Sequence, residues 1–443
     1  MYSTTPAFNL KVVLKETGLA ADTLRAWERR YGLPVPQRSA GGHRLYSQRD
    51  IETIKWLMKR QAEGLSISRA VDMWNEQFGS GTDPLAGSAP SAFASSGLPI
   101  PYQAPDTTLD SLRTGWVQAC LDFSESAAEQ ILNQAFSMFP VEAVCIDILQ
   151  QGMSEIGERW YENRASVQQE HFASGLAMRR LDALLSASPA PTRNQTVLVG
   201  CPSEEWHAFT PLLLSLLIRR RGLNVIYLGA NVPSEQFSNT VHSLKIDLVV
   251  LVAQQLITAA TLQSTALVLS SQNISVAFGG RIFSIHPELP NAIPGFFLGH
   301  SLNAGVEQIE LILNKKLRLP QARIASPSYV AAHQAFVSKR DQIELAFKEL
   351  LEPLFMLPDN IKTGIHFLGE NITAALQLGD MSHVSTEVDW LKTLLQSHDA
   401  QPQQLIHFME TYSDAVNQNI NGNGMPIFEW LAAEVEKLQT SQE

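Results

Sequence analysis

The 443-residue chain contains little of what marks a secreted, membrane-spanning or disulfide-stabilised protein. Its three cysteines, Cys120, Cys145 and Cys201, form no CxxC pair, which argues against both a disulfide framework and a cysteine-based zinc site. No run of 18 apolar residues occurs, and the first residues do not follow the pattern of a signal peptide. We therefore expect a cytoplasmic protein that does not contact a membrane.

Charge is sparse and unevenly distributed, since charged residues make up 17% of the chain and the net charge is −11. Residues 1–77 contain 12 Lys and Arg against 8 Asp and Glu, a net +4. The other residues contain 21 of the 33 basic and 36 of the 44 acidic side chains, a net −15. Because DNA phosphates attract positive charge and repel negative charge, only the first segment suits a duplex, and the rest should be held away from it.

The basic segment has the pattern of a winged helix-turn-helix. Residues 23–31, TLRAWERRY, predict a helix, and a proline-containing break and a glycine turn at Gly41-Gly42 predict a wing after it. An α-helix fits the major groove, where its arginines would meet the duplex. The residues that we expect at the DNA are Thr23, Arg25, Trp27, Arg29, Arg30, Arg38, His43, Arg44 and Tyr46.

The order and spacing of this block resemble those of the MerR family of transcription regulators over residues 8–77. Two further helices are expected at about 48–62 and 66–77 from their apolar periodicity. The resemblance implies that residues 1–77 bind a double-stranded DNA operator. Residues 78–108 are rich in Gly, Ser, Ala and Pro, which is typical of a flexible linker.

The remainder of the chain predicts three more domains, so we expect a multidomain α and α/β protein. In residues 109–190, apolar side chains recur every three or four positions, which predicts a four-helix bundle. In residues 191–320, five short β-rich runs alternate with helices and predict a doubly wound parallel sheet. These runs are residues 196–201, 224–228, 247–252, 274–278 and 295–298. Residues 328–443 predict an extra helical domain whose role the sequence does not indicate.

Polar residues and glycines follow the predicted strands, at the edge where parallel sheets bind ligands. His207 follows the first strand, so its imidazole could coordinate a metal within a bound ligand. A neighbouring glutamate, Glu204 or Glu205, could hold the other ring nitrogen. Gly229 follows the second strand and Gly279-Gly280 follows the fourth, which would leave room for a bulky planar or nucleotide-like group.

This arrangement resembles cobalamin-binding domains, whose signature has an acidic residue two positions before the histidine and a glycine three positions after it. Glu205 and His207 match that signature, whereas Thr210 replaces the glycine. Ala253 stands where a serine is usual after the third strand. The resemblance implies His207 as the axial ligand of cobalt. It also implies these cofactor-binding residues in the α/β domain: Glu205, Gly229, Gly279 and Gly280.

In the predicted bundle, Trp160 is followed after nine residues by Glu170 and His171. This spacing resembles that of the CarH/LitR-type light-sensing MerR regulators, which bind adenosylcobalamin. The resemblance implies that these three side chains cover the upper face of the cofactor. Eleven residues, about three turns, separate Trp160 from His171, so the two would share a face of a continuous helix. Tyr161 stands where those proteins have a second histidine, which leaves His171 or water as the cobalt ligand after illumination.

Together the resemblances imply a light-responsive transcription regulator that acts as a repressor. Adenosylcobalamin held between the bundle and the α/β domain would control self-assembly into a dimer or tetramer, and so the affinity for DNA. The alternative is a MerR-type regulator whose degenerate cobalamin-like domain binds another tetrapyrrole or no ligand, and which responds through its C-terminal helical domain or a protein partner. We do not expect an enzyme, because a DNA-binding head is present and a barrel-sized substrate domain is not.

Overall fold

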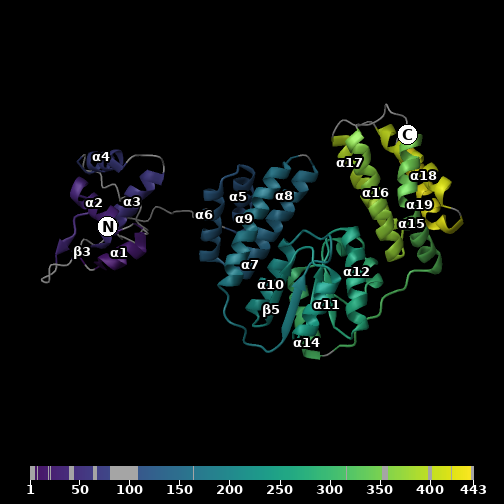
Figure 1. The fold of residues 1–443 in the computed structure, drawn as a ribbon, viewed down its shortest axis with the longest axis horizontal. Helices are drawn as coiled ribbons and strands as arrows, with labels where there is room; N and C mark the ends of the chain where they lie inside the picture. Colours follow the sequence, from purple (N-terminus) through teal and green to yellow (C-terminus); the bar gives the residue numbers. More distant parts are fainter. Residues whose placement is uncertain are drawn as a thin grey trace. The chain divides into compact units, whose positions relative to one another are not determined.

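The structure, a computed structural model, forms two compact units, Met1–Gln103 and Ala104–Glu443 (Figure 1). It describes residues 5–6, 8–17, 19, 21–38, 44–62, 67–79, 108–162, 164–315, 317–351, 358–397, 402–420 and 422–440. Most of the predicted linker, residues 80–107, lies outside the described residues. Within the described ranges, no helix combines the length and hydropathy needed to cross a bilayer.

The first unit is a winged helix-turn-helix. Its helices are α1 (Leu10–Thr17), α2 (Ala21–Tyr31), α3 (Gln48–Ala62) and α4 (Ile67–Gly79). Its antiparallel sheet has the order β1-β3-β2, with strands β1 (Phe8–Asn9), β3 (Arg44–Tyr46) and β2 (Gln37–Arg38). Leu24 and Trp27 of α2 pack with Ile54 of α3 in one hydrophobic cluster, which leaves the opposite face of α2 to solvent.

The second unit begins with the four-helix bundle, which confirms that part of the predicted fold. Its helices are α5 (Leu109–Leu121), α6 (Glu125–Met138), an uninterrupted segment of α7 (Val141–Ala143), the π-helical η1 (Val144–Gln150) and α8 (Gln151–Tyr161), and then α9 (Val167–Ser186). Thr108 and Ser166 begin α5 and α9, because each side chain accepts a hydrogen bond from the backbone N–H three residues later.

The sheet of the second unit is parallel and doubly wound, with the strand order β5-β4-β6-β7-β8. Its strands are β4 (Thr196–Gly200), β5 (Asn224–Gly229), β6 (Leu248–Val252), β7 (Val276–Gly279) and β8 (Phe296–Phe297). Its helices are α10 (Phe209–Arg220), α11 (Ser234–Ser243), α12 (Leu256–Ser271), α13 (Ile282–Ile285), the 3-10 helix η2 (Leu289–Ala292) and α14 (Leu302–Lys315). All five predicted strands form, and the runs of Val and Leu in β4 and β6 are typical of strands covered on both faces.

The two faces of the sheet belong to two different hydrophobic clusters. Val199 and Val250 face one cluster, which contains α10, α14 and the bundle. Leu198 and Val249 face the other, which contains α11 and α12. Since side chains alternate between the faces of a strand, the bundle shares a core with one layer of the α/β domain and is absent from the other.

Within the described residues, five helices follow the α/β domain, and α16 packs against its second layer. They are α15 (Pro327–Leu350), α16 (Pro358–Leu378), α17 (Ser382–Ser397), α18 (Pro402–Asn419) and α19 (Met425–Thr440), with the short 3-10 helix η3 (Gly422–Gly424) before the last. Helix α16 lies along α12, as the green and teal ribbons show (Figure 1). The predicted fold class, a winged helix-turn-helix, a bundle, a parallel α/β domain and a C-terminal helical domain, is confirmed.

Candidate functional site

His207 lies in the loop between β4 and α10, at the carboxyl edge of the sheet. Its Nδ1 is 2.6 Å from Oε1 of Glu205, which also accepts a 3.0 Å hydrogen bond from the backbone N–H of His207. Glu205 is fully buried, whereas more than half of the His207 side chain is exposed. The glutamate that holds the second ring nitrogen is therefore Glu205, and not Glu204, which is exposed.

Two residues that the sequence analysis missed complete the surroundings of Glu205. Its Oε2 accepts hydrogen bonds from the Thr258 hydroxyl and the Gln254 backbone N–H, both at 2.6 Å. Burial raises the pKa of Glu205, but hydrogen bonds from His207, Thr258 and Gln254 outweigh it and hold the pKa below its usual value. Thr258, in the first turn of α12, thus supports Glu205 from the segment that follows β6.

The His207 imidazole is suited to bind a metal through its other nitrogen. The hydrogen bond to Glu205 raises the pKa of His207, while burial lowers it and the negative charge of Glu170 raises it further. No hydrogen-bond partner of Nε2 occurs among the described residues. A carboxylate on Nδ1 fixes the tautomer that leaves the Nε2 lone pair available, which is the usual arrangement of a metal-bound histidine. The donor set therefore fits a single axial ligand of cobalt.

The three glycines near this loop differ in backbone conformation and in the space around them. Gly229 has a φ of +83°, and a Cβ there would meet nothing within 4 Å, so its free side permits a close approach. Gly280 has a φ of +130°, and a Cβ there would lie 1.8 Å from the carbonyl oxygen of Ala253. Gly280 thus allows two loops of the α/β domain to pack together, rather than leaving open space for a ligand. At Gly279 a Cβ would make an ordinary contact with Leu298.

The three bundle residues Trp160, Glu170 and His171 do not lie on one continuous helix, so the condition under which Trp160 and His171 would share a helix face is not met. Helix α8 ends at Tyr161, and Ser166 starts α9 with a capping box to Gln169. Trp160 is therefore in the last turn of one helix, and Glu170 and His171 are near the start of the next. Glu170 Oε2 lies 2.7 Å from Nδ1 of the exposed His171.

The beginning of α9 and the loop that carries His207 lie close together. The negative charge of Glu170 raises the pKa of His207, and the positive charge of Arg281, which follows Gly280, lowers it. The Arg281 guanidinium lies 5.7 Å from the ring centroid of Tyr161. Residues from the bundle and from two loops of the α/β domain are thus brought to one place, as a ligand held between them requires.

The candidate DNA surface is the exposed face of α2. Thr23, Arg25, Arg29 and Arg30 are exposed on this helix. The Arg29 Nε donates to the carbonyl oxygen of Arg25 at 3.3 Å, and the Arg30 guanidinium lies 5.5 Å from the Tyr31 ring centroid. Such contacts leave guanidinium groups on the outside of the helix, where phosphates and base edges can be reached.

Two of the predicted DNA contacts are structural instead. Trp27 is 5% exposed and Tyr46 is fully buried, because both pack in the core of the head. Glu28 connects the helix to the wing, since it accepts a 2.6 Å hydrogen bond from the Tyr46 hydroxyl and a 2.9 Å ion-paired hydrogen bond from Arg44 Nε. Arg44 therefore contributes to wing placement as well as positive charge. The His43 prediction and the Arg38 side chain lie outside the described residues.

Two protein-family models match the chain. Residues 8–77 match the MerR HTH family regulatory protein, which covers the described helix-turn-helix and wing. Residues 112–185 match the B12 binding domain, which covers the helical bundle. The two matches fall on the two parts that carry the arginines of α2 and the residues Trp160, Glu170 and His171.

Curated relatives align over more than half of the chain. The HTH-type transcriptional repressor CarH of Myxococcus xanthus is 28% identical over 242 residues, which are 55% of this chain and 77% of CarH. The HTH-type transcriptional repressor CarA of Myxococcus xanthus is 30% identical over 245 residues, which are 55% of this chain and 75% of CarA. Similarity at this level extends well beyond a DNA-binding head of about 70 residues.

A solved structure also resembles part of the chain. The monomethylamine corrinoid protein of Methanosarcina barkeri is 16% identical, and the alignment covers 46% of this chain and 97% of that protein with a TM-score of 0.39.

Proposed function

Because the chain belongs to the MerR-type transcription regulators with a cobalamin-binding domain, as CarA and CarH do, we propose that it is a light-responsive repressor with adenosylcobalamin as its cofactor. The chain is a regulator rather than an enzyme and takes a corrinoid. Beyond a regulator that takes a corrinoid, we propose four further points: the adenosyl form of the cofactor, the response to light, the repressor role and the change of assembly state.

The observation that carries the proposal is the pair of His207 and Glu205. A buried carboxylate holds Nδ1 of a mainly exposed imidazole, so Nε2 points its lone pair outward for cobalt. Glu205 in turn is held by Thr258 and Gln254, which fixes the orientation of the imidazole from behind. This network of hydrogen bonds behind an exposed imidazole is typical of a histidine that binds a metal.

The bundle residues would cover the opposite face of the cofactor. Trp160 has an indole surface that can pack on the adenosyl group, and Glu170 and His171 present polar atoms that can hydrogen-bond its hydroxyls. When bound, adenosylcobalamin supplies a cobalt–carbon bond that visible light breaks. Loss of the adenosyl group would remove the contacts of Trp160 and so release α8 and α9 from the position that they hold in the dark.

DNA affinity would follow from assembly. Each head has a net charge of only +4 over residues 1–77, so one head alone would bind weakly against the −15 of the remainder. Two or more heads in one dark assembly would bind neighbouring operator half-sites together, and the second would bind at a high effective concentration. A change of the bundle in light would separate the copies and lower the affinity, provided that the cofactor binds one state better.

The test is to mix the purified protein with adenosylcobalamin in the dark, desalt it, and record absorption, size-exclusion and gel-shift profiles before and after green light. We expect retained cobalamin, a larger dark assembly, and operator binding that light abolishes. His207→Ala should abolish cobalamin retention, and His242→Ala, an exposed histidine of α11, should not.

The outcomes separate the parts of the proposal. Failure of the unaltered protein to retain cobalamin would reject the cofactor and leave another tetrapyrrole, or a partner of the C-terminal helices, as the signal. Retention without a change in assembly or DNA binding after illumination would reject the response to light alone. Stronger DNA binding after illumination would reject the repressor mechanism drawn here.

A further inference from the structure

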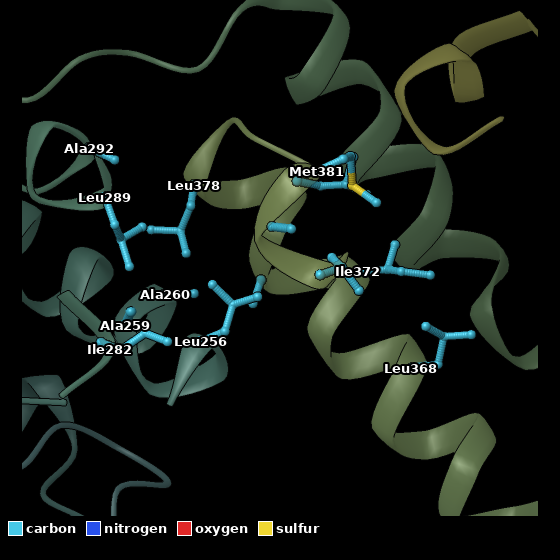
Figure 2. Close-up of a cluster of buried hydrophobic side chains, with 14 of the residues drawn as sticks. Leu256, Ala259, Ala260, Ile282, Leu289, Ala292, Leu368, Ile372, Leu378 and Met381 are labelled. Atoms are coloured by element: carbon cyan, nitrogen blue, oxygen red, sulfur yellow. The ribbon is translucent and has the colours of Figure 1, made fainter. Parts of the chain in front are cut away.

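The C-terminal helices share a hydrophobic core with the α/β domain. Leu256, Ala259 and Ala260 of α12 belong to the same cluster of buried side chains as Leu368 and Ile372 of α16. Figure 2 shows Leu256, Leu289 and Leu378 between the teal ribbons and the olive helix, whereas Leu368 lies on the side of that helix away from the teal ribbons. Since these side chains belong to one continuous cluster, a movement of α16 would displace α12 or open a gap in the core.

A polar contact fixes α16 along α12. The side-chain nitrogen of Gln377, near the end of α16, lies 2.7 Å from the Ala260 carbonyl oxygen, 2.9 Å from the Ser264 hydroxyl and 3.1 Å from Gln263 Oε1. An apolar interface of this kind tolerates sliding, whereas hydrogen bonds at defined positions select one register. Gln377 therefore determines how far along α12 the C-terminal helices sit.

The beginning of α12 is also part of the His207 site. Thr258 donates its hydroxyl to Glu205 Oε2, and Gln254, just before the helix, donates its backbone N–H to the same oxygen. Thr258 lies in the same helical turn as Leu256 and Ala259, which belong to the cluster shared with α16. One short helical turn thus contacts the C-terminal helices on one side and the carboxylate that orients His207 on the other.

A second connection runs through α17. The ring of His383 in α17 packs against that of His286 in a tilted arrangement, with ring centroids 4.5 Å apart. The positive charge of Arg281 also acts on Glu387, one turn further along α17. The backbone N–H of Arg281 donates to Gln254 Oε1 at 2.9 Å, so the loop after β7 and the loop after β6 are joined at the residue that supports Glu205. Both connections end at Glu205.

We propose that the C-terminal helices position the axial histidine of the corrinoid site, with Gln377 as the positioning residue that sets α12 and, through Thr258 and Glu205, orients His207. The effect on cobalt binding rests on the proposed corrinoid function, whereas the contacts that connect α16 with Glu205 do not. It assigns to residues 328–443 the role of an effector module: whatever shifts these helices changes how firmly His207 binds cobalt.

The first test needs no corrinoid. Gln377→Met keeps the side-chain volume and removes the three contacts, and Gln439→Met makes the same change on the exposed surface of α19. Backbone amide exchange of residues 203–208 and 253–258 then reports the hydrogen bonds of His207 and Gln254 to Glu205. We expect exchange there to rise about three- to tenfold in Gln377→Met, the effect of losing about one hydrogen bond, and to stay unchanged in Gln439→Met.

The second test measures the dissociation constant and the visible spectrum of bound hydroxocobalamin, which distinguishes a histidine-ligated from an unligated lower face. We expect Gln377→Met to weaken binding several-fold and to reduce histidine ligation. Gln377→Glu, whose carboxylate cannot donate a hydrogen bond to the Ala260 carbonyl oxygen, should act in the same direction and serves if Gln377→Met does not fold.

Unchanged amide exchange and unchanged corrinoid binding in both variants would overturn the inference. If the unaltered protein binds no hydroxocobalamin, the proposed cofactor fails, while the exchange experiment still decides whether α16 controls the His207 loop. The failure of one proposal is therefore distinguishable from the failure of the other.

Discussion

The rings of His286 and His383 contact each other where the α/β domain meets the C-terminal helices, with their centroids 4.5 Å apart and their planes inclined by 56°. His286 is 8% exposed, and its Nε2 has no hydrogen-bond partner among the described residues. Burial and the neighbouring His383 lower the pKa of His286 to about 4. Burial also lowers the pKa of His383, although Asp380 opposes this. The contact is therefore formed by two neutral imidazoles.

Acid should weaken this contact. At pH 7 the His286 imidazole is neutral in both the folded and the unfolded chain, so its low folded pKa costs nothing. As the pH falls below the unfolded pKa of about 6.5, only the unfolded chain takes up the proton readily, and the free energy of unfolding decreases until about pH 4. A shift of this size corresponds to about 3 kcal/mol. Urea denaturation at pH 7, 6, 5 and 4.5 measures it.

His286→Phe should remove that part of the pH dependence, so that the free energy of unfolding falls less between pH 7 and pH 5 in the variant than in the unaltered protein. The exposed His242→Phe is the matched control and should keep the full dependence. Parallel pH profiles for His286→Phe and the unaltered protein would show that His286 is protonated in the folded state as readily as in the unfolded one.

Glu205→Gln should reduce corrinoid affinity about 10- to 100-fold, the usual cost of losing a supporting partner of a metal ligand. The amide lacks the negative charge that stabilises the proton on Nδ1 of His207, and its nitrogen cannot accept the hydrogen bonds that Thr258 and Gln254 donate to Oε2. Equilibrium binding of hydroxocobalamin, followed by absorbance, measures this loss.

Glu204→Gln is the control for that change, because Glu204 is the exposed neighbour whose backbone N–H, not its carboxylate, bonds Asn231. Its corrinoid affinity should remain within about twofold of the unaltered protein. Equal losses in the two variants would mean that general negative charge near the loop matters, and not the contact of Glu205 with His207.

Arg29→Ala should weaken operator binding and reduce its dependence on salt. Each lysine or arginine that neutralises one phosphate contributes about 0.9 to the slope of log affinity against log salt concentration, so a single lost contact should lower that slope by about this amount. Gel-shift titrations at several salt concentrations measure it. Arg318→Ala removes an exposed arginine outside the head and should leave the slope unchanged.

Gly152→Ala should lower the free energy of unfolding by about 1–3 kcal/mol, because the new methyl would lie 2.8 Å from two ring atoms of the fully buried Trp116. Gly157 lies in the same helix α8, with nothing within 4 Å of an added Cβ. Gly157→Ala should therefore raise stability by about 0.5–1 kcal/mol through helix propensity. Thermal or urea denaturation of the two variants measures this difference in sign.

Much of the fold could be predicted from local patterns. The runs of Val and Leu in β4 and β6 identify strands that are buried on both faces, and the arginine-rich α2 has a distinctive order of residues. The break before α9 was also readable, because Ser166 and Gln169 have the spacing of a capping box. That signal decides against a continuous helix from Trp160 to His171, the condition for the two side chains to share a helix face.

Other features depend on contacts between distant segments. Thr258 is 53 residues from Glu205, and no spacing rule links a hydroxyl in α12 to a carboxylate after β4. Tyr46 resembles a wing residue in sequence, but its hydroxyl finds Glu28 across the head and its ring enters the core. The packing of α12 against α16 could not be predicted either, because the apolar residues of each helix do not indicate which partner they contact.

Helix α12 has apolar residues on the side of the sheet and on the side of α16, so nearly its whole circumference is covered. A shortened protein that ended before α15 would leave Leu256, Ala259 and Ala260 bare to water. Exposed apolar patches of this kind promote non-specific aggregation. The oligomeric mass measured for such a fragment would include non-specific aggregates as well as any light-dependent assembly. The oligomeric state should therefore be determined on the 443-residue chain.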